Sequence, residues 1–160
     1  MITLTTLSAS DTRPLRQQLL RQGVPLDQLV YDGDDDADAL HLGALDGEAL
    51  VGIASVVRQS PAVSNGTPAH HPNPHSPHAW RIRGMAVLPD YRAQGVGKLL
   101  LLRCIDYAFE MQGRFIWCDA RIHARGFYEK YGLRVMGEVY DVPNVGQHYY
   151  MQRDLARVCE

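Results

Sequence analysis

The segment DYRAQGVGKLLL, residues 90–101, combines residue types that could hold an anion. Gly95 and Gly97 stand one residue apart, directly before an apolar run that predicts a helix. The first four N–H groups of a helix have no internal partner, and the helix dipole adds partial positive charge there. The segment therefore predicts an anion site at a helix N-terminus, to which Arg92 or Lys98 could add charge.

Two common phosphate-binding loops do not fit this segment. A P-loop for magnesium nucleotides needs Ser or Thr after its Gly-Lys pair, and Leu99 stands at that position. A dinucleotide-binding loop needs a third glycine, where its helix packs closely on a strand, and Leu100 stands there. Residues 92–97 match a third pattern, Arg/Gln-x-x-Gly-x-Gly/Ala, which follows a strand ending in MAVLP.

This third pattern resembles the pyrophosphate-binding motif of the GNAT family of N-acetyltransferases. A second segment, ARGFYEKYGL at residues 124–133, is similar to the family's Ala-x-x-Phe-Tyr-x-x-x-Gly-Phe segment. The tail GEVYDVPNVGQHYYM, residues 137–151, resembles the ending of a subgroup of small bacterial members. The resemblance covers about residues 80–155 by motif and the first half of the chain by element order alone. It identifies the acetyl donor better than the amine acceptor.

The resemblance implies that acetyl-CoA is the acetyl donor and that no metal is needed. The pyrophosphate of acetyl-CoA would meet the backbone N–H groups of the glycine loop. The pantetheine arm would pair with the preceding strand, at the point where that strand splays from residues 115–119. A backbone N–H there would polarise the thioester carbonyl. The donor-binding residues that the resemblance implies are Met85, Ala86, Val87, Arg92, Ala93, Gln94, Gly95, Val96, Gly97 and Lys98.

Tyr128 occupies the family's general-acid position. A phenol, with a pKa of about 10, can return a proton to a leaving thiolate without a large mismatch. The alternative is that Tyr128 is an aromatic packing residue, as is expected of Phe127 and Tyr131.

The base that deprotonates the acceptor's ammonium group is less constrained by the sequence. His148 has a suitable intrinsic pKa and lies on the last predicted strand. Glu138, Asp141 or a chain of waters are alternatives, and His148 could also be a hydrogen-bonded strand residue without a catalytic role.

Arg83, Arg121 and Glu138 are the candidates for binding the acceptor. Arg121 stands where many family members carry an asparagine that contacts pantetheine, so it could instead reach a phosphate or an acceptor carboxylate. Arg83 stands where some relatives offer a carboxylate, and with Arg81 it favours an anionic acceptor unless both are ordinary exposed strand charges.

The elements that must position these residues follow from hydrophobic periodicity, caps and turns. Ser10, Asp11 and Thr12 are the expected caps of the first helix, and Asp46-Gly47 is the expected hairpin turn. Strands are predicted at residues 2–7, 39–45, 49–57, 80–88, 115–118, 133–140 and 148–153, and helices at residues 13–22, 97–111 and 124–131. The order β-α-β-β-β-α-β-α-β-β indicates an α/β protein, and the resemblance implies the GNAT-type acyl-CoA N-acyltransferase fold, a central mixed, mostly antiparallel sheet flanked by helices.

Length and composition fit one domain over residues 1–160, with a flexible Pro- and His-rich loop at 59–79. His70, His71, His75 and His78 invite a metal site, but the prolines between them prevent the fixed scaffold of structural zinc, so a mobile loop over the acceptor site is expected. The acidic run at 32–38 is expected to be a solvated loop.

A net charge of −2 gives no basic field for nucleic acid, and no apolar run approaches the roughly 20 residues of a membrane span. Cys104, Cys118 and Cys159 form no metal-ligand spacing and predict reduced thiols in the cytoplasm. Because Cys104 and Cys118 lie in apolar elements, a covalent acetyl-cysteine route is disfavoured.

The sequence thus favours an acetyl-CoA-dependent N-acetyltransferase that transfers the acetyl group to a primary amine by direct attack in a ternary complex. A non-catalytic CoA-binding module or sensor is the alternative, and Tyr128 argues against it. A nucleotide-binding protein fits less well, because of Leu99 and Leu100. The expected partner is a small-molecule or peptide amine, with a homodimer left open.

Overall fold

The computed structural model of the chain describes residues 1–61 and 78–155. It divides into two compact units, of which the first consists of Met1–Val57 and Ile82–Asp106, and the second of Arg58–Arg81 and Tyr107–Glu160. Strand β4 (Ala79–Val87) and helix α2 (Val96–Glu110) each contribute to both units.

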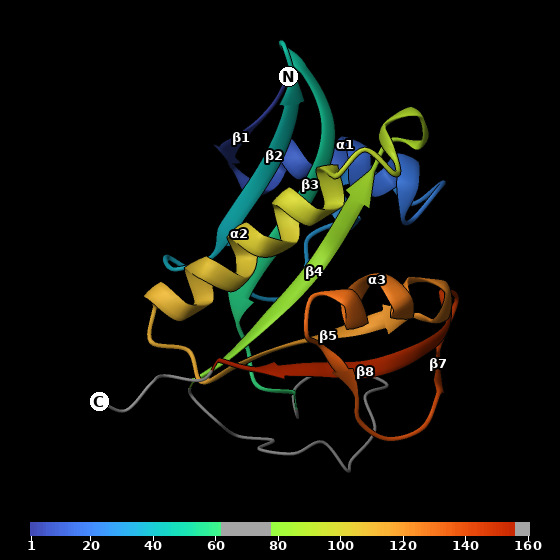
Figure 1. The fold of residues 1–160 in the computed structure, drawn as a ribbon. Coiled ribbons are helices and arrows are strands. Elements are labelled where there is room, and N and C mark those ends of the chain that lie inside the picture. Colours follow the sequence, from blue (N-terminus) through green and yellow to red (C-terminus); the bar gives the residue numbers. More distant parts are fainter. Residues whose placement is uncertain (62–77, 156–160) are drawn as a thin grey trace. The chain divides into compact units, whose positions relative to one another are not determined.

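The first unit is a sheet with helices on both faces. Its hydrogen-bonded strand order is β1 (Ile2–Leu7), β2 (Leu40–Asp46), β3 (Ala49–Arg58), β4, with β1, β2 and β3 successively antiparallel. Leu15 of α1 (Ala9–Leu19) packs with Ile53 of β3, whereas a Cβ on the preceding residue, Gly52, would meet Val96 and Leu100 of α2. Because successive strand residues point to opposite faces, α1 and α2 cover opposite sides of this sheet (Figure 1).

The second unit is built on the long strand β8 (Gly146–Asp154). On one side β8 pairs antiparallel with β5 (Phe115–Arg121), and on the other with the short strands β6 (Arg134–Val135) and β7 (Tyr140–Val142). The start of β4 pairs parallel with β5, from Ala79 opposite Phe115 to Arg81 opposite Trp117. Helix α3 (Arg125–Lys130) follows β5 (Figure 1).

The prediction of a mixed sheet flanked by helices is confirmed, and most predicted elements lie within a residue or two of the observed ones. The first helix, however, begins earlier than expected, and its cap is Ser8 rather than Ser10, Asp11 or Thr12. The Ser8 hydroxyl accepts a hydrogen bond from the Asp11 N–H (3.2 Å), and the Asp11 carboxylate accepts one from the Ser8 N–H (3.1 Å). This capping box satisfies two N–H groups at once, which lowers the pKa of Asp11.

Three further boundaries differ from the predictions. The expected strand 133–140 is wrong, because Gly137, with a φ of +96°, separates β6 from β7 and both pair with β8. The hairpin turn is Gly47-Glu48 rather than Asp46-Gly47, since Asp46 still pairs with Ala49. Strand β5 continues past residue 118 to Arg121, which pairs with His148.

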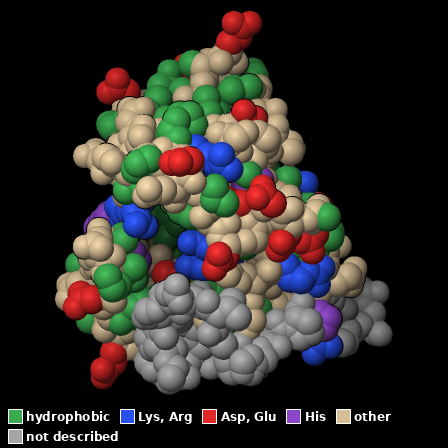
Figure 2. Space-filling model, turned by 180° about the vertical axis from the view of Figure 1, so that it is seen from behind, with side chains coloured by type: hydrophobic (Ala, Val, Ile, Leu, Met, Phe, Trp, Pro, Cys, Tyr) green, Lys and Arg blue, Asp and Glu red, His purple; other side chains and the backbone are tan. Residues whose placement is uncertain are grey.

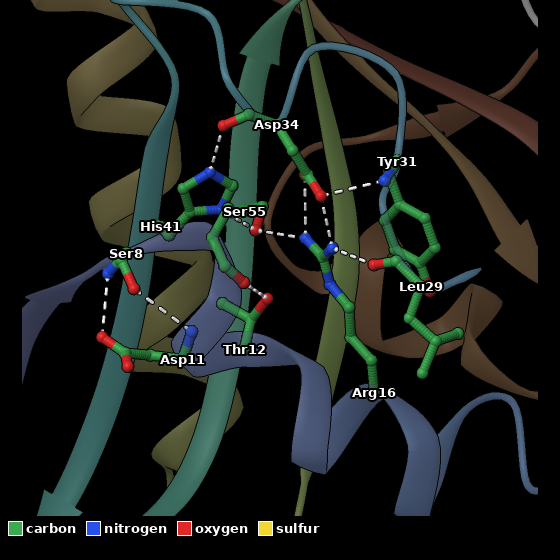
Figure 3. A network of polar contacts seen from close by, with 10 residues as sticks. Ser8, Asp11, Thr12, Arg16, Leu29, Tyr31, Asp34, His41 and Ser55 are labelled. Atoms are coloured by element: carbon green, nitrogen blue, oxygen red, sulfur yellow. Dashed lines mark hydrogen bonds and ion pairs between the residues drawn. The ribbon is translucent and has the colours of Figure 1, made fainter. Parts of the chain in front are cut away.

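The expectation that the acidic run 32–38 is a solvated loop is wrong at Asp34. Its side chain is 0% exposed and accepts two hydrogen bonds from the equally buried Arg16 of α1, at 2.6 and 3.0 Å (Figure 3). Arg16 also donates to the Leu29 carbonyl and to Ser55 of β3, and Asp34 accepts the Tyr31 N–H. The pair therefore fastens the segment after α1 to the helix and the sheet.

The Pro- and His-rich loop predicted at 59–79 lies outside the described residues from 62 to 77, and with it His70, His71 and His75. At its ends, the Gln59 N–H donates to the Ala79 carbonyl. In the described ranges, no group of three or more His, Cys, Asp or Glu side chains could hold a metal ion. Over the same ranges, no helix has the length and apolar character needed to cross a membrane. The single domain over 1–160 stays a prediction.

Candidate functional site

The glycine loop forms a turn that opens into the N-terminus of α2. Ala93 and Gly95 have φ values of +63° and +80°, and α2 begins at the next residue, Val96. The Leu99 N–H donates to the Gly95 carbonyl, so the N–H groups before it lie in the turn of helix that lacks internal partners. Nothing lies within 4 Å of a Cβ built at Gly95. The loop thus offers backbone donors beside open space, as an anion site requires.

Contacts within the first unit hold this loop in place. The Tyr91 hydroxyl donates to Asp46 of β2 at 2.6 Å, and this bond raises the pKa of Tyr91. Arg92 donates from Nε to the Val87 carbonyl at 3.1 Å, which fixes the start of its guanidinium beside the end of β4. Gln94 donates to the Asp90 carbonyl at 2.7 Å. Val96 is buried beneath the loop, whereas Ala93, Gln94, Gly95 and Lys98 are exposed.

The predicted donor strand is the last part of β4. Ala86 is buried in the core with Leu15 and Ile53, and its neighbours Met85 and Val87 are half-buried. Arg83 is not an ordinary exposed charge, because its guanidinium carbon lies 4.3 Å from the centre of the Tyr31 ring. The charge of Arg81 is compensated in the second unit, where it donates to Asp119 at 2.8 Å.

Tyr128 is the buried residue of α3, with 8% of its surface exposed. Its ring packs edge-on against Phe127, which also contacts Tyr131, so the aromatic cluster expected from the sequence is present. Three residues before Tyr128 and on the same side of the helix, Arg125 lies over the ring of Tyr149. This contact assigns α3 to the face of β8 that carries Tyr149.

His148 points to the other face of β8, because it directly precedes Tyr149 in the strand. It is 5% exposed, and its Nδ1 lies 2.8 Å from the carbonyl oxygen of Gly146. Its cross-strand neighbours are Arg121 on β5 and Tyr140 on β7. His148 is thus a buried, hydrogen-bonded strand residue, a setting that leaves a catalytic role open.

The sequence did not single out the partners of Tyr140 and Asp119. The Tyr140 hydroxyl donates to Asp119 Oδ1, while Arg81 binds the other carboxylate oxygen. Burial, and then the negative charge of Asp119, raise the pKa of Tyr140. The alternation of β5 could have indicated that Asp119 shares a face with Trp117 and Arg121, but not that β7 would reach it.

The structure groups the predicted residues by unit. The donor loop, residues Met85 to Val87 and Arg83 belong to the first unit, and Tyr128, His148, Arg121 and Glu138 belong to the second. In the second unit Glu138 and Asp141 are exposed, and Arg121 is half-buried beside His148.

Cys104 and Cys118 are fully enclosed, at 0% and 2% exposed. Burial raises the pKa of the Cys104 thiol from 9.0 to about 12, and burial with the adjacent Asp119 raises that of Cys118. The thiolate, which is the nucleophilic form, is therefore scarce at neutral pH, which disfavours an acetyl-cysteine intermediate.

This environment predicts slow alkylation of both thiols in the folded chain. Iodoacetamide at pH 8 is expected to label Cys104 and Cys118 only after denaturant is added, as measured by peptide mass spectrometry. Because the folded pKa of Cys104 is raised, its contribution to stability is complete below pH 9 and is lost as the pH rises towards about 12. Rapid labelling of the folded chain at pH 8 would contradict the assignment of buried, protonated thiols.

Comparisons with known proteins identify the family of the chain. The model of the Acetyltransferase (GNAT) family matches residues 7–133. The "Uncharacterized N-acetyltransferase YitI" of Bacillus subtilis (strain 168) is 33% identical over 156 residues, which are 97% of each chain. The crystal structure of Escherichia coli ElaA has a TM-score of 0.72 at 19% identity, over 96% of this chain and 99% of its own. An aminoglycoside 6'-N-acetyltransferase complexed with coenzyme A has a TM-score of 0.66 at 14% identity, over 99% of each chain. The chain therefore belongs to the GNAT family of N-acetyltransferases, which use acetyl-CoA as acetyl donor.

Proposed function

We propose that this chain transfers the acetyl group of acetyl-CoA to a primary amine by direct attack in a ternary complex. The observation that carries the proposal is the open glycine loop at the N-terminus of α2, in a chain that belongs to the GNAT family. A site of this kind holds a pyrophosphate through backbone N–H groups, and the flanking Arg92 and Lys98 add positive charge.

The donor would be held by the loop from Arg92 to Lys98 and by the main chain of Met85 to Val87. Open space at Gly95 supports this assignment, because a Cβ at that position would stand between the backbone and a bound phosphate. No covalent intermediate on a cysteine is part of the proposal, since Cys104 and Cys118 are buried and protonated.

In this proposal Tyr128 is the general acid and His148 the general base. His148 takes one proton from the acceptor's ammonium group and passes it to solvent, which frees the nitrogen lone pair. The carbon–nitrogen bond then forms and the carbon–sulfur bond breaks. Tyr128 gives its proton to the sulfur and regains one from solvent, and the acetylated nitrogen loses its second proton to solvent, so the protons balance.

The acceptor is proposed to be a small-molecule or peptide amine, and the candidates for binding it are Arg83 in the first unit and Arg121 and Glu138 in the second. Nucleic acid is not a proposed partner: on the face drawn in Figure 2, acidic and basic side chains are interspersed among the described residues, and neither sign forms a continuous patch. A cytoplasmic location and a homodimer stay predictions.

A panel of amines tests the proposed function. Purified chain is mixed with acetyl-CoA and each of a set of polyamines, amino acids, aminoglycosides and peptides, and release of the CoA thiol is followed by a thiol reagent. The proposal expects acetyl transfer, with the acetylated amine found by mass spectrometry, for at least one class. Tight binding of acetyl-CoA by calorimetry, with no turnover on any amine, would favour the alternative of a non-catalytic CoA-binding module.

Substitution of Gly97 by Val tests the donor loop. A branched side chain in the first turn of α2 stands close to backbone donors, so we expect acetyl-CoA affinity measured by calorimetry to fall by about 100-fold or more. The thermal midpoint should change little, because Gly97 lies in the first turn of the helix and is only half-buried. Leu99→Ala, at an exposed position two residues further along, is the matched control and should keep wild-type affinity. Wild-type affinity in the Gly97 variant would overturn the loop assignment.

A further inference from the structure

One face of the second unit carries four polar side chains at adjoining positions of three strands. His148 on β8 is directly opposite Arg121 on β5 and Tyr140 on β7. Side chains of directly opposed residues lie on the same face of a sheet, and so do those of residues two apart. Asp119, two residues before Arg121 on β5, therefore belongs to this face as well.

The hydrogen bond at Gly146 sets the tautomer of His148. A carbonyl oxygen can only accept, so the Nδ1 that lies 2.8 Å from it must carry the hydrogen. In the neutral ring, Nε2 then carries the lone pair, which is the nitrogen a base needs. Because the residue is almost fully enclosed, its neighbours rather than solvent decide which way Nε2 points.

Tyr140 is the neighbour that contacts the imidazole from β7. The two rings are 6.3 Å apart between centres and inclined by 29°. Strand β7 has only three residues, so its own backbone pairing holds Tyr140 weakly. The phenol is instead anchored by its hydrogen bond to Asp119, whose other oxygen is bound by Arg81 at 2.8 Å. A continuous line of contacts thus runs from Arg81 through Asp119 and Tyr140 to His148.

We propose that Tyr140 is a positioning residue for His148: anchored on Asp119, its ring holds the imidazole in the orientation in which Nδ1–H bonds to the Gly146 carbonyl and Nε2 is turned towards the acceptor amine. The inference rests on the proposed role of His148 as base. The inference also assigns the side of the sheet on which the acceptor binds. His148 and Tyr140 lie on one face of β8, and Tyr149 lies on the other. Arg125 of α3 lies over the Tyr149 ring, on that other face. The amine and the acid Tyr128 therefore belong to opposite faces.

Nitrogen NMR of the labelled full chain tests the tautomer without any turnover. A long-range ¹H–¹⁵N spectrum at a pH where the imidazole is neutral distinguishes the protonated from the unprotonated ring nitrogen, and loss of signals in His148→Ala assigns the residue. We expect His148 to be the Nδ1–H tautomer in the wild type. Tyr140→Phe keeps the ring but removes the anchor, and is expected to give averaged nitrogen shifts from two tautomers.

Tyr149→Phe is the matched control, since it removes a hydroxyl from the adjacent β8 position on the other face and should leave the His148 nitrogens unchanged. If Tyr140→Phe fails to fold, Asp119→Asn replaces it, because the amide keeps the size of the carboxylate while weakening the anchor. An Nε2–H tautomer in the wild type, or His148 nitrogens unaltered in a folded Tyr140 or Asp119 variant, would overturn the proposal.

Kinetics separate this inference from the proposed function. With an amine that the panel identifies, Tyr140→Phe is expected to lower kcat by about 10-fold to 100-fold with an unchanged KM for acetyl-CoA, as a misplaced base would. His148→Ala should lower kcat at least as much. Wild-type kcat in His148→Ala would refute the role of His148 as general base. It would also refute a catalytic effect of Tyr140, even if the spectra show the predicted tautomer. If the chain acetylates no amine, the proposed function is refuted. The NMR spectra would still show whether Tyr140 positions the His148 ring.

Discussion

Replacing Asp34 with Ala is expected to lower the free energy of unfolding by about 3–5 kcal/mol, because it leaves the Arg16 guanidinium buried without its counter-charge. Both side chains are 0% exposed, and two hydrogen bonds at 2.6 and 3.0 Å join them. A loss of this size is a large part of the roughly 5–15 kcal/mol that holds an ordinary domain folded. Urea denaturation followed by circular dichroism measures it as a lower midpoint.

The neighbouring Asp35 provides the matched control for this prediction. Asp35 is exposed in the same segment, so Asp35→Ala should change the free energy of unfolding by no more than about 0.5 kcal/mol. A double variant, Arg16→Met with Asp34→Leu, removes both charges and should recover much of the loss, because the penalty comes from one charge left unpaired rather than from a strong net attraction. Equal urea midpoints for the wild type and the Asp34 variant would contradict the buried pair.

The burial of Asp34 could not be predicted from its sequence position. It lies in a run of aspartates, and nothing local distinguishes it from Asp35, which is exposed. What singles it out is Arg16, eighteen residues earlier, together with Ser55 on β3. A buried charge is stable only when its partners arrive from other elements, and that is a property of the tertiary fold rather than of a local pattern.

Most of the fold could be predicted from the sequence, because hydrophobic periodicity, helix caps and turns are local signals. Spacing along α2 predicted one apolar helical face of Leu101, Cys104, Ile105, Ala108 and Met111. The first four are buried, whereas Met111 is half-buried just beyond the end of the helix. The failure at residues 133–140 is instructive, because one strand was predicted where Gly137 interrupts the backbone. One glycine with a positive φ thus outweighs the propensity of its neighbours.

In the candidate site too, local motifs predict some residues, whereas other contacts depend on the tertiary fold. The glycine loop and Tyr128 follow from contiguous motifs, and the loop has the open geometry that an anion site needs. The anchoring of Tyr140 on Asp119 joins residues twenty-one positions apart, through the pairing of β5, β8 and β7. Register between strands decides such a contact, and a single sequence does not fix the register of a strand as short as β7, which has three residues.

The largest effect on activity is expected from Tyr128→Phe. Loss of the phenol hydroxyl leaves the departing thiolate without its proposed proton donor, and general-acid catalysis is worth about 10²–10⁴ in rate, so kcat should fall by that factor. The fold should persist, because the Phe ring keeps the edge-on contact with Phe127. Acetyl-CoA affinity should stay near the wild-type value, since the loop proposed to hold the pyrophosphate lies at the N-terminus of α2 and not on α3.

The measurement compares kcat and the KM for acetyl-CoA of the wild type with those of two variants on an amine that the panel identifies. Tyr131→Phe is the matched control, because Tyr131 follows the same helix and contacts the same Phe127 ring without an assigned role in proton transfer. A fall in kcat confined to Tyr128→Phe supports the acid, because loss of aromatic packing would affect both variants and would appear in their thermal midpoints. Wild-type kcat in Tyr128→Phe would remove Tyr128 from the mechanism. Because the pKa of the CoA thiol lies well below that of bulk water, the thiolate would then leave unprotonated and take its proton from solvent.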